Sequence, residues 1–239
     1  MPQPQKAQST LGSAPYAPAS HTLSPPPVPK WVRGDPAKES RKERRDSGAR
    51  NARLVKRANE TNTQYDFVLY GDSITNNLVD KFKSSWTKNF GDMKNAAALG
   101  IGGNTVEELS WRLALGKEKF EVAPRCVAVL VGINNIKRVF SDPVEKLDSF
   151  LLPWMRATWP STKIVLLGML PNASKDVRPF NAKYEQLASK HGATYSSCGS
   201  DIDPRSTDMP DGTHPSAAGY AKALPCLRRV VDTLVGRPR

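Results

Sequence analysis

The fold of this chain is already visible in one stretch, Phe67-Val68-Leu69-Tyr70-Gly71-Asp72-Ser73-Ile74, where four apolar residues run into a glycine and two polar residues. A continuous apolar run of this kind is typical of a strand that is covered on both faces, as strands of parallel sheets are. Ligands bind beyond the carboxyl ends of such strands. We therefore expect a buried strand that ends at a polar site.

The same pattern recurs along the chain, with apolar runs separated by Gly-rich turns and amphipathic stretches. This alternation predicts successive βα units and hence a three-layer α/β sandwich, a parallel sheet of about five strands with helices on both faces. Helix starts are indicated by Asn104 with Glu107, and by Asp142 with Pro143 and Glu145. A last helix is expected over 215–235. The predicted strands are 66–70, 94–99, 126–131, 164–170 and 193–196.

Ser73 is the candidate nucleophile. It stands where the first strand gives way to a helix, so its oxygen is expected near the positive end of that helix and its backbone N–H faces developing negative charge. Taken alone, a serine after Gly-Asp is more often a helix cap. The chain has no G-x-S-x-G sequence, so the nucleophile elbow of an ordinary α/β-hydrolase is not indicated.

His214 is the candidate base among the three histidines. His21 lies in the N-terminal region, and His191 precedes Gly192 as the last residue of a helix would, which indicates a structural role. Asp211 can turn back through Gly212 to accept the Nδ1 proton of His214, which leaves Nε2 free for the proton of Ser73. Without the histidine, Asp211-Gly212 would be predicted as a plain β-turn.

Gly103 and Asn134 are the candidate oxyanion donors, together with the backbone N–H of Ser73. Each lies in a loop that follows a predicted strand, and an N–H without an obstructing side chain or an amide NH₂ is what a tetrahedral oxyanion needs. The loop that holds Gly103 could also be a dinucleotide loop, but Thr105 stands at its sixth position and it follows the second strand. Neither a P-loop nor an H-E-x-x-H sequence occurs, so we expect no cofactor and no metal.

Taken in order, these blocks resemble the SGNH (GDSL-type) serine esterase family. The resemblance covers about residues 65 to 235. In the residues of its motifs, the chain is most similar to the branch of platelet-activating-factor acetylhydrolase catalytic subunits. It implies a flavodoxin-like sheet and hydrolysis of esters of lipids, sugars or other small acyl donors. It also implies the roles of Ser73, Gly103, Asn134 and His214, with Asp211 as the acid three residues before the histidine.

The N-terminal region differs from the rest. Residues 1 to 36 hold nine prolines, and the first 60 residues carry a net charge of +7 out of +12. We predict an extended or disordered arm over 1–37, a basic segment over 38–60 that can form a helix, and the hydrolase domain over 61–239. The basic segment is expected either to be solvated or to bind an acidic partner, such as a protein assembly, nucleic acid or an anionic surface. Deletion of residues 1 to 60 should then leave hydrolysis intact.

Cysteine usage and hydropathy bear on the compartment. Cys126, Cys198 and Cys226 are odd in number and far apart, so the sequence indicates neither a disulfide framework nor a zinc site and favours a reducing compartment. No apolar stretch is long enough to span a membrane, and no secretory signal is evident. We expect a soluble or assembly-bound intracellular protein. The sequence does not indicate an oligomeric state.

The sequence therefore predicts a metal-independent serine esterase that acts on a small ester substrate through an acyl-Ser73 intermediate. The resemblance favours a small acyl group such as acetyl. The alternative is a structural or interaction protein of a large assembly that keeps the hydrolase fold and docks through its basic arm.

Overall fold

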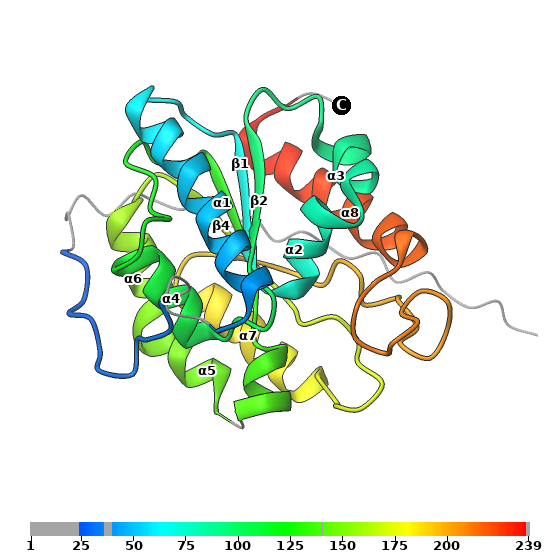
Figure 1. The fold of residues 1–239 in the computed structure, drawn as a ribbon. Helices are drawn as coiled ribbons and strands as arrows, with labels where there is room; N and C mark the ends of the chain where they lie inside the picture. Colours follow the sequence, from blue (N-terminus) through cyan, green and yellow to red (C-terminus); the bar gives the residue numbers. More distant parts are fainter. Residues whose placement is uncertain (1–23, 36–39, 140, 238–239) are drawn as a thin grey trace, which may run out of the picture.

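The computed structural model describes residues 24–35, 40–139 and 141–237. Its centre is a five-stranded sheet, in which every pair of neighbouring strands is parallel and the order is β2-β1-β3-β4-β5 (Figure 1). This confirms the predicted α/β sandwich. The strands are β1 (Phe67–Gly71), β2 (Ala96–Gly100), β3 (Cys126–Leu130), β4 (Lys163–Leu167) and β5 (Thr194–Ser196).

Helices cover both faces of the sheet. One face packs against α2 (Ser73–Asp80), α3 (Lys83–Phe90) and α8 (Ala217–Val235). The other face packs against α1 (Lys42–Glu60), α4 (Val106–Ala114), α5 (Pro143–Lys146), α6 (Leu152–Thr158) and α7 (Arg178–Lys190), with π-helical segments at Asn135–Val139 and Leu147–Leu151. Successive residues of β1 alternate between the two cores, Phe67 and Leu69 on one side and Val68 and Tyr70 on the other. That is why the strand has to be apolar at every position.

The carboxyl ends of three strands lie level with one another. Gly71 at the end of β1 is paired with Gly100 of β2 and with Leu130 of β3. A side chain at Gly100 would overlap the backbone of Asn76, so the glycine allows α2 to cross directly above the end of β2. The loops that follow these strands therefore begin side by side.

Several helix and strand limits differ from the sequence prediction. β4 ends at Leu167 rather than residue 170. The cap of α4 is Thr105, whose side chain accepts from the N–H of Glu108, one residue later than expected. The reason is that the side chain of Asn104 is buried and binds Arg112 instead. Similarly, α8 begins after Ser216 rather than at Pro215, because the Ser216 hydroxyl accepts from the first free N–H groups. Asp142 caps α5 as predicted.

The basic segment forms α1, and the expectation that it is solvated was wrong. Val55 and Ala58 of this helix are buried in the core, and Asn51 donates to the carbonyl of Gly100 over 3.2 Å. The sequence pattern concealed this face because a mainly polar set, Arg44, Ser47, Gly48 and Asn51, is also buried in it. The domain limits at 37 and 61 stay a prediction, but α1 is packed on the sheet.

Residues 24–35, which belong to the predicted arm, lie against the same face; residues 1–23 and 36–37 of that arm are outside the described ranges. Val32 is buried, and the Trp31 ring meets the ring of Phe150 edge-on with 5.8 Å between centroids. The ammonium of Lys146 lies 4.7 Å from the centre of the Trp31 ring, a cation–π arrangement. This part of the N-terminal region is therefore not a free tail.

The cysteines also correct the sequence prediction, because Cys198 and Cys226 form a disulfide. The two residues are 28 positions apart, and only the path of the chain after β5 brings Cys198 against α8. The argument from cysteine spacing for a reducing compartment therefore fails, and the compartment stays a prediction. Cys126 is a buried free thiol. Within the described residues, no helix combines the length and apolar character that a membrane crossing requires.

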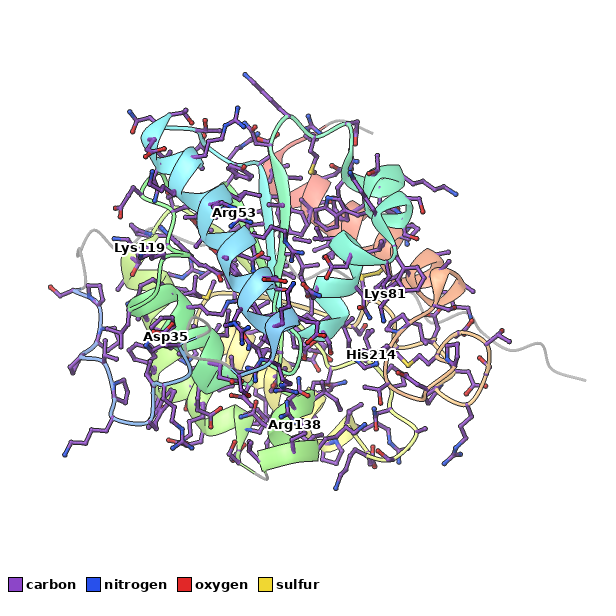
Figure 2. The ribbon with its side chains drawn as sticks, in the orientation of Figure 1. Asp35, Arg53, Lys81, Lys119, Arg138 and His214 are labelled. Carbon is purple, nitrogen blue, oxygen red and sulfur yellow. A yellow bond between two sulfur atoms is a disulfide. The ribbon has the colours of Figure 1, made fainter. Side chains whose placement is uncertain are left out.

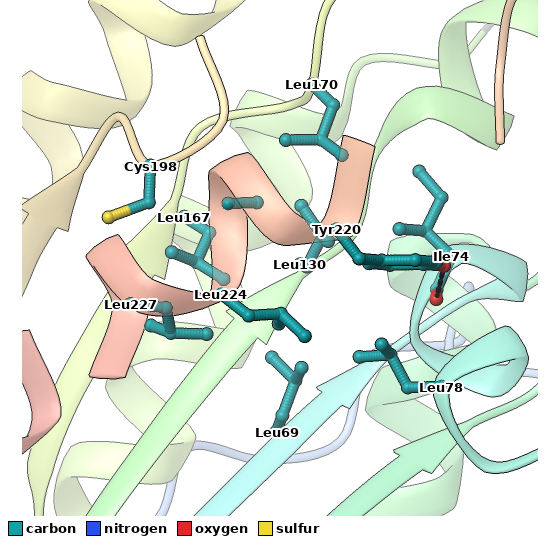
Figure 3. A pocket seen from close by; sticks show the side chains of 11 residues that line it. Leu69, Ile74, Leu78, Leu130, Leu167, Leu170, Cys198, Tyr220, Leu224 and Leu227 are labelled. Carbon is teal, nitrogen blue, oxygen red and sulfur yellow. Dashed lines mark hydrogen bonds between the residues drawn. The ribbon is translucent and has the colours of Figure 1, made fainter. Parts of the chain in front are cut away.

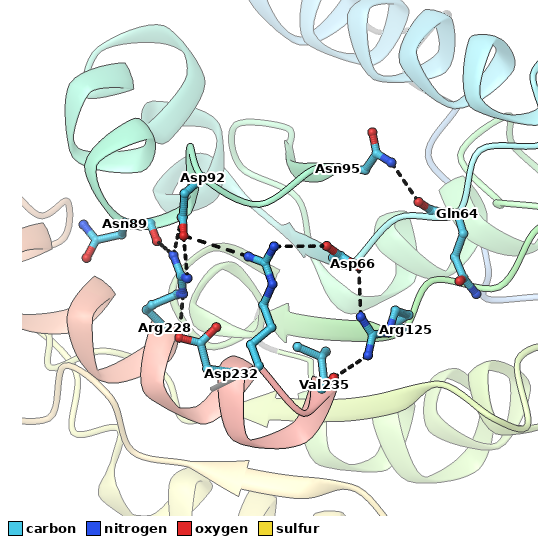
Figure 4. A network of polar contacts seen from close by, with 10 residues as sticks. Gln64, Asp66, Asn89, Asp92, Asn95, Arg125, Arg228, Asp232 and Val235 are labelled. Carbon is cyan, nitrogen blue, oxygen red and sulfur yellow. Dashed lines mark hydrogen bonds and ion pairs between the residues drawn. The ribbon is translucent and has the colours of Figure 1, made fainter. Parts of the chain in front are cut away.

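A polar network secures the end of α8 beside the amino ends of the strands (Figure 4). The Arg228 guanidinium binds Asp92 and Asp232, while Arg125 binds Asp66 and the carbonyl of Val235. The hydrogen bond from Arg228 is the main cause that lowers the pKa of Asp92 to about 2, and it outweighs the opposing effect of burial. The charges thus lie at the end of the sheet opposite to the loops that follow the strands.

The contact between α1 and β2 is testable. Asn51→Ala should lower the free energy of unfolding by about 1–3 kcal/mol, because the buried carbonyl of Gly100 loses its donor. Arg53→Ala, an exposed change two residues away on the same helix, should alter it by less than about 0.5 kcal/mol. Urea unfolding of both variants is the measurement. Equal effects would show that α1 is not held through Asn51.

Candidate active site

Three of the predicted site residues form one chain of hydrogen bonds. Ser73 Oγ lies 2.8 Å from His214 Nε2, and His214 Nδ1 lies 2.6 Å from Asp211 Oδ2. In the sequence, His214 is 141 residues and Asp211 is 138 residues after Ser73. Figure 2 shows His214 in the lower half of the view, beyond the ends of the strands. The arrangement of hydroxyl, imidazole and carboxylate is that of a serine triad.

Ser73 is placed by the junction of β1 and α2. Asp72 caps the helix by accepting from the N–H of Ile74 over 2.9 Å, so Ser73 becomes the first helical residue. Its backbone N–H is one of those that a helix leaves without an intrahelical acceptor. The alternative role for Ser73, that of a helix cap, belongs to Asp72 in the structure.

The loop that carries His214 is held from two sides. Asp211 Oδ1 accepts from the N–H groups of Thr213 and His214, at 2.9 and 2.7 Å. The Thr213 hydroxyl accepts from Lys137 Nζ at 2.8 Å and from Asn172 Nδ2 at 3.0 Å. Neither Lys137 nor Asn172 was found from the sequence. Asn172 follows β4 closely, so the rule that polar residues gather beyond strand ends could have found it.

The two aspartates of the site have pKa values shifted in opposite directions. Partial burial tends to raise the pKa of Asp211, but the hydrogen bonds from His214 and Thr213 outweigh it and bring the pKa to about 2. Asp72 is almost completely buried, and this burial raises its pKa to about 6 in spite of the hydrogen bond from Ile74. Asp211 therefore stays ionised beside the imidazole at neutral pH, whereas the charge of Asp72 is destabilised by its surroundings.

Gly103 lies in the turn after β2 with φ at +75°, a conformation that favours glycine. Arg138 Nη1 donates to the carbonyl of Gly103 over 3.1 Å, and a side chain at Gly103 would overlap that guanidinium nitrogen. A side chain at the neighbouring Gly102 would come within 4.0 Å of the Ser73 Cβ. The turn is thus next to the serine.

The amide of Asn134 is also at this edge of the sheet. Its Nδ2 donates to the carbonyl of Asn104 over 3.0 Å and to Asp72 Oδ2 over 3.3 Å. Both amide hydrogens thus have an acceptor, so an oxyanion would have to replace one of them. The contact with Asp72 is the longer and hence the weaker of the two. Asp72 and Asn104, which the sequence did not single out, therefore orient the predicted oxyanion donor.

The side chain of Arg112 connects β1, β2 and the loop after β2. Its guanidinium is buried and donates to the carbonyls of Gly71 at 3.0 Å and Leu99 at 2.6 Å. It also binds Asn104 Oδ1 at 3.0 Å and forms an ion pair with Glu118 at 2.6 Å. One side chain thereby fixes the ends of β1 and β2 and the loop that holds Gly103. Arg112 was not among the site residues predicted from the sequence.

The structural role predicted for His191 is confirmed, because this residue caps the end of α7. Its ring also pairs with Asp148 at 2.7 Å. Tyr184 of the same helix is fully buried and donates to the carbonyl of Val131. An apolar cavity of about 30 Å³ lies behind Ile74, between the sheet and α8, where Leu69, Leu224 and Tyr220 converge (Figure 3).

Comparisons with known proteins agree with this architecture. Residues 69–222 match the model of the GDSL-like Lipase/Acylhydrolase family. The human platelet-activating factor acetylhydrolase IB subunit alpha2 is 31% identical over 124 residues, which cover 51% of this chain and 52% of that protein. The chain thus spans about half the length of this relative and of its rat counterpart.

Solved structures show the same fold. A structure described as a platelet activating factor from Streptococcus pneumonia superposes with a TM-score of 0.63 at 20% identity, over 80% of this chain and 93% of that one. The carbohydrate acetylesterase Est24 from Sinorhizobium meliloti superposes with a TM-score of 0.54 at 18% identity, over 70% and 98%.

The sheet order and the family match define the class of this chain as an α/β sandwich of the GDSL-like hydrolase type. The chain belongs to the GDSL-like lipase/acylhydrolase family, also called the SGNH family.

The buried ion pair of Arg112 gives one test. Arg112→Met should lower the free energy of unfolding by about 3–5 kcal/mol, because Glu118 is left as a buried charge without a partner. Arg112→Met combined with Glu118→Leu should recover part of this loss. Lys56→Met, which breaks the exposed pair with Glu60, should cost less than about 1 kcal/mol. A double variant no more stable than Arg112→Met would contradict this account.

The raised pKa of Asp72 gives a second test. The folded protein holds this proton more tightly than the unfolded chain, so the resulting stability is present below the ordinary value of 3.8 and is lost as pH rises through about 6. Asn cannot titrate. The free energy of unfolding of Asp72→Asn, minus that of the unchanged protein, should therefore increase by up to about 3 kcal/mol between pH 4 and pH 7.5. Urea unfolding at each pH measures it, and parallel profiles would refute it.

Proposed function

We propose that this chain is a serine esterase that cleaves a carboxylic ester through an acyl-Ser73 intermediate. The observation that carries the proposal is the unbroken set of contacts from Ser73 Oγ to His214 and from His214 to Asp211. A serine hydroxyl is a weak nucleophile unless an adjacent base takes its proton, and here the base is within hydrogen-bond distance.

The reaction has two halves. Ser73 Oγ attacks the ester carbonyl carbon as its proton passes to His214 Nε2, and the carbonyl oxygen becomes an oxyanion. His214 then gives the proton to the departing alkoxide, so the alcohol leaves and the acyl group remains on Ser73. A water molecule attacks the acyl carbon, its proton passes through His214 to Ser73 Oγ, and the carboxylic acid is released. No step needs a metal ion or a cofactor.

The backbone N–H groups of Ser73 and Gly103 and the amide of Asn134 are the proposed donors to the oxyanion. The turn at Gly102 and Gly103 lies beside Ser73, which supports this role. Asn134 contributes when the oxyanion replaces Asp72 Oδ2, the more distant of its two acceptors. Losing one such donor in a hydrolase of this type lowers turnover by roughly 10²–10³.

A small acyl group, such as acetyl, is the proposed acid part of the substrate. Two observations support this proposal. The relatives are named platelet-activating factor acetylhydrolase, and the motif residues of this chain resemble those of that branch. The acidic partner expected for the basic N-terminal region stays a prediction, since the packing of α1 explains only the buried side of that helix.

Covalent labelling tests the function. A fluorophosphonate should modify Ser73, because only an activated serine reacts at an appreciable rate. His214→Ala should abolish this labelling, and Asp211→Asn should slow it strongly, since the equivalent change in a known triad lowers turnover about 10⁴-fold. Mass spectrometry of the labelled peptide locates the adduct.

His191→Ala is the matched control, because His191 forms the same kind of pair with Asp148 and touches no serine of the site. It should leave labelling of Ser73 unchanged. If the folded protein hydrolyses no ester and Ser73 stays unlabelled at neutral pH, the esterase function is wrong.

A further inference from the structure

A cavity of about 280 Å³, lined mainly by charged and small residues, lies directly beside the predicted oxyanion site. Gly103 belongs to both. The walls come from segments far apart in the sequence, namely the N-terminal segment, the turn after β2, the first turn of α4 and the end of the π-helical segment after β3. They are formed by Arg33, Gly34, Gly103, Thr105, Glu107, Glu108, Arg138, Val139 and Ser141.

Two arginines supply the cavity with hydrogen-bond donors. Both Arg138 and Arg33 are exposed. Arg138 uses one nitrogen for the carbonyl of Gly103, which leaves most of its five N–H groups available. Arg33 makes no hydrogen bond or ion pair with any residue in the described part of the chain. The guanidinium of Arg138 is therefore fixed next to the reacting centre, and Arg33 faces the same space.

The two acids of the cavity wall are already engaged. Glu108 Oε1 is paired with Arg44, and its Oε2 accepts from the backbone of Thr105 at 2.8 Å. Glu107 is buried, and its two oxygens accept from Asn135 at 2.7 Å and from Ser141 at 3.0 Å. All four carboxylate oxygens thus have a donor. Arg44 offsets the charge of Glu108, but the donors to Glu107 are neutral, so Arg33 and Arg138 leave the cavity with N–H donors and a small excess of positive charge.

The lining does not suit an alkyl chain, because Val139 is the one large apolar side chain among the lining residues that the structure describes. A cavity of this size also exceeds what an acetyl group fills, so beside the oxyanion position it is suited to the alcohol part of the ester. We propose that it binds a carboxylate or phosphate carried by the alcohol part of the substrate, and that Arg33 and Arg138 select for that group. This proposal rests on the esterase function proposed above.

The guanidinium geometry fits both anions. Its planar fork gives two parallel N–H···O bonds to a carboxylate or to a phosphate, and it remains charged at every relevant pH. A neutral hydroxyl at the same place accepts fewer of these hydrogen bonds and has no ionic attraction to the guanidinium. The selection should therefore appear as a ratio of kcat/KM between anionic and neutral substrates that share one acyl group.

The experiment uses the full chain and three monoacetyl esters acylated at the same hydroxyl, those of glucose, glucuronic acid and glucose 6-phosphate. We expect kcat/KM for at least one anionic ester to exceed that for the glucose ester by about tenfold or more, and the ratio to fall with added salt. Arg33→Gln and Arg138→Gln should each reduce the ratio several-fold. Arg53→Gln, an exposed arginine on α1 away from the cavity, should not change it (Figure 2).

Calorimetry with glucuronate and glucose 6-phosphate gives a readout that does not depend on turnover. Either anion should bind to the unchanged protein more tightly than glucose, and less tightly to both cavity variants. Whichever anion is favoured in both measurements identifies the group that the arginines accept.

The results separate the two proposals. Ser73-dependent hydrolysis with equal kcat/KM for all three esters would overturn the selection by Arg33 and Arg138 and leave the esterase function standing. An anionic preference that survives in both cavity variants would have the same meaning. Absence of Ser73-dependent hydrolysis of every ester, together with an unlabelled Ser73, would overturn the esterase function and this proposal with it.

Discussion

The buried guanidinium of Arg112 is the interaction on which the site depends. It joins the carbonyls of Gly71 in β1 and Leu99 in β2 to the side chain of Asn104 and to the carboxylate of Glu118. Burying such a charge costs several kcal/mol unless it is paired and hydrogen-bonded, and here the ion pair with Glu118 and the three further hydrogen bonds offset that cost below the candidate site. The loops that carry Ser73 and Gly103 are thereby set relative to each other by one rigid planar group.

The N-terminal region continues this support from the outside. Asn51 of α1 holds the carbonyl of Gly100, and Arg44 holds Glu108 at the start of α4, on either side of the loop that contains Gly103. Arg33 then reaches the cavity beside that loop. A segment that composition marks as a separate basic arm therefore contributes to the wall of the cavity beside Gly103. Its positive charge is explained in part by these contacts within the chain.

The site also shows how one residue type serves opposite purposes. Asp211 is half exposed and accepts three hydrogen bonds, so its charge is stable and available to the imidazole. Asp72, the residue before Ser73, is buried and accepts hydrogen bonds from Ile74 and Asn134. Burial destabilises its charged form and raises its pKa. Burial raises the pKa of both carboxyls, but at Asp211 the hydrogen bonds from His214 and Thr213 outweigh it, whereas at the fully buried Asp72 they do not.

What the sequence by itself determined is local. The apolar runs defined the strands within a few residues, because a strand covered on both faces must be apolar throughout. Ser73, Gly103, Asn134, Asp211 and His214 could be selected because each follows a strand or stands at a loop–helix junction, and parallel strands end at one edge. The structure brings Ser73, His214 and Asp211 into contact, as that reasoning expected.

What only the tertiary structure decided are the contacts between distant segments. The disulfide between Cys198 and Cys226, the packing of α1 and the four bonds of Arg112 depend on how loops travel between elements. Loop paths have no periodic signal, and a buried polar residue such as Asn51 looks like a surface residue until its partner is known. Sequence periodicity reports which face of an element is apolar. It does not report which polar groups from distant segments come into contact, and such segments together line the cavity beside Gly103.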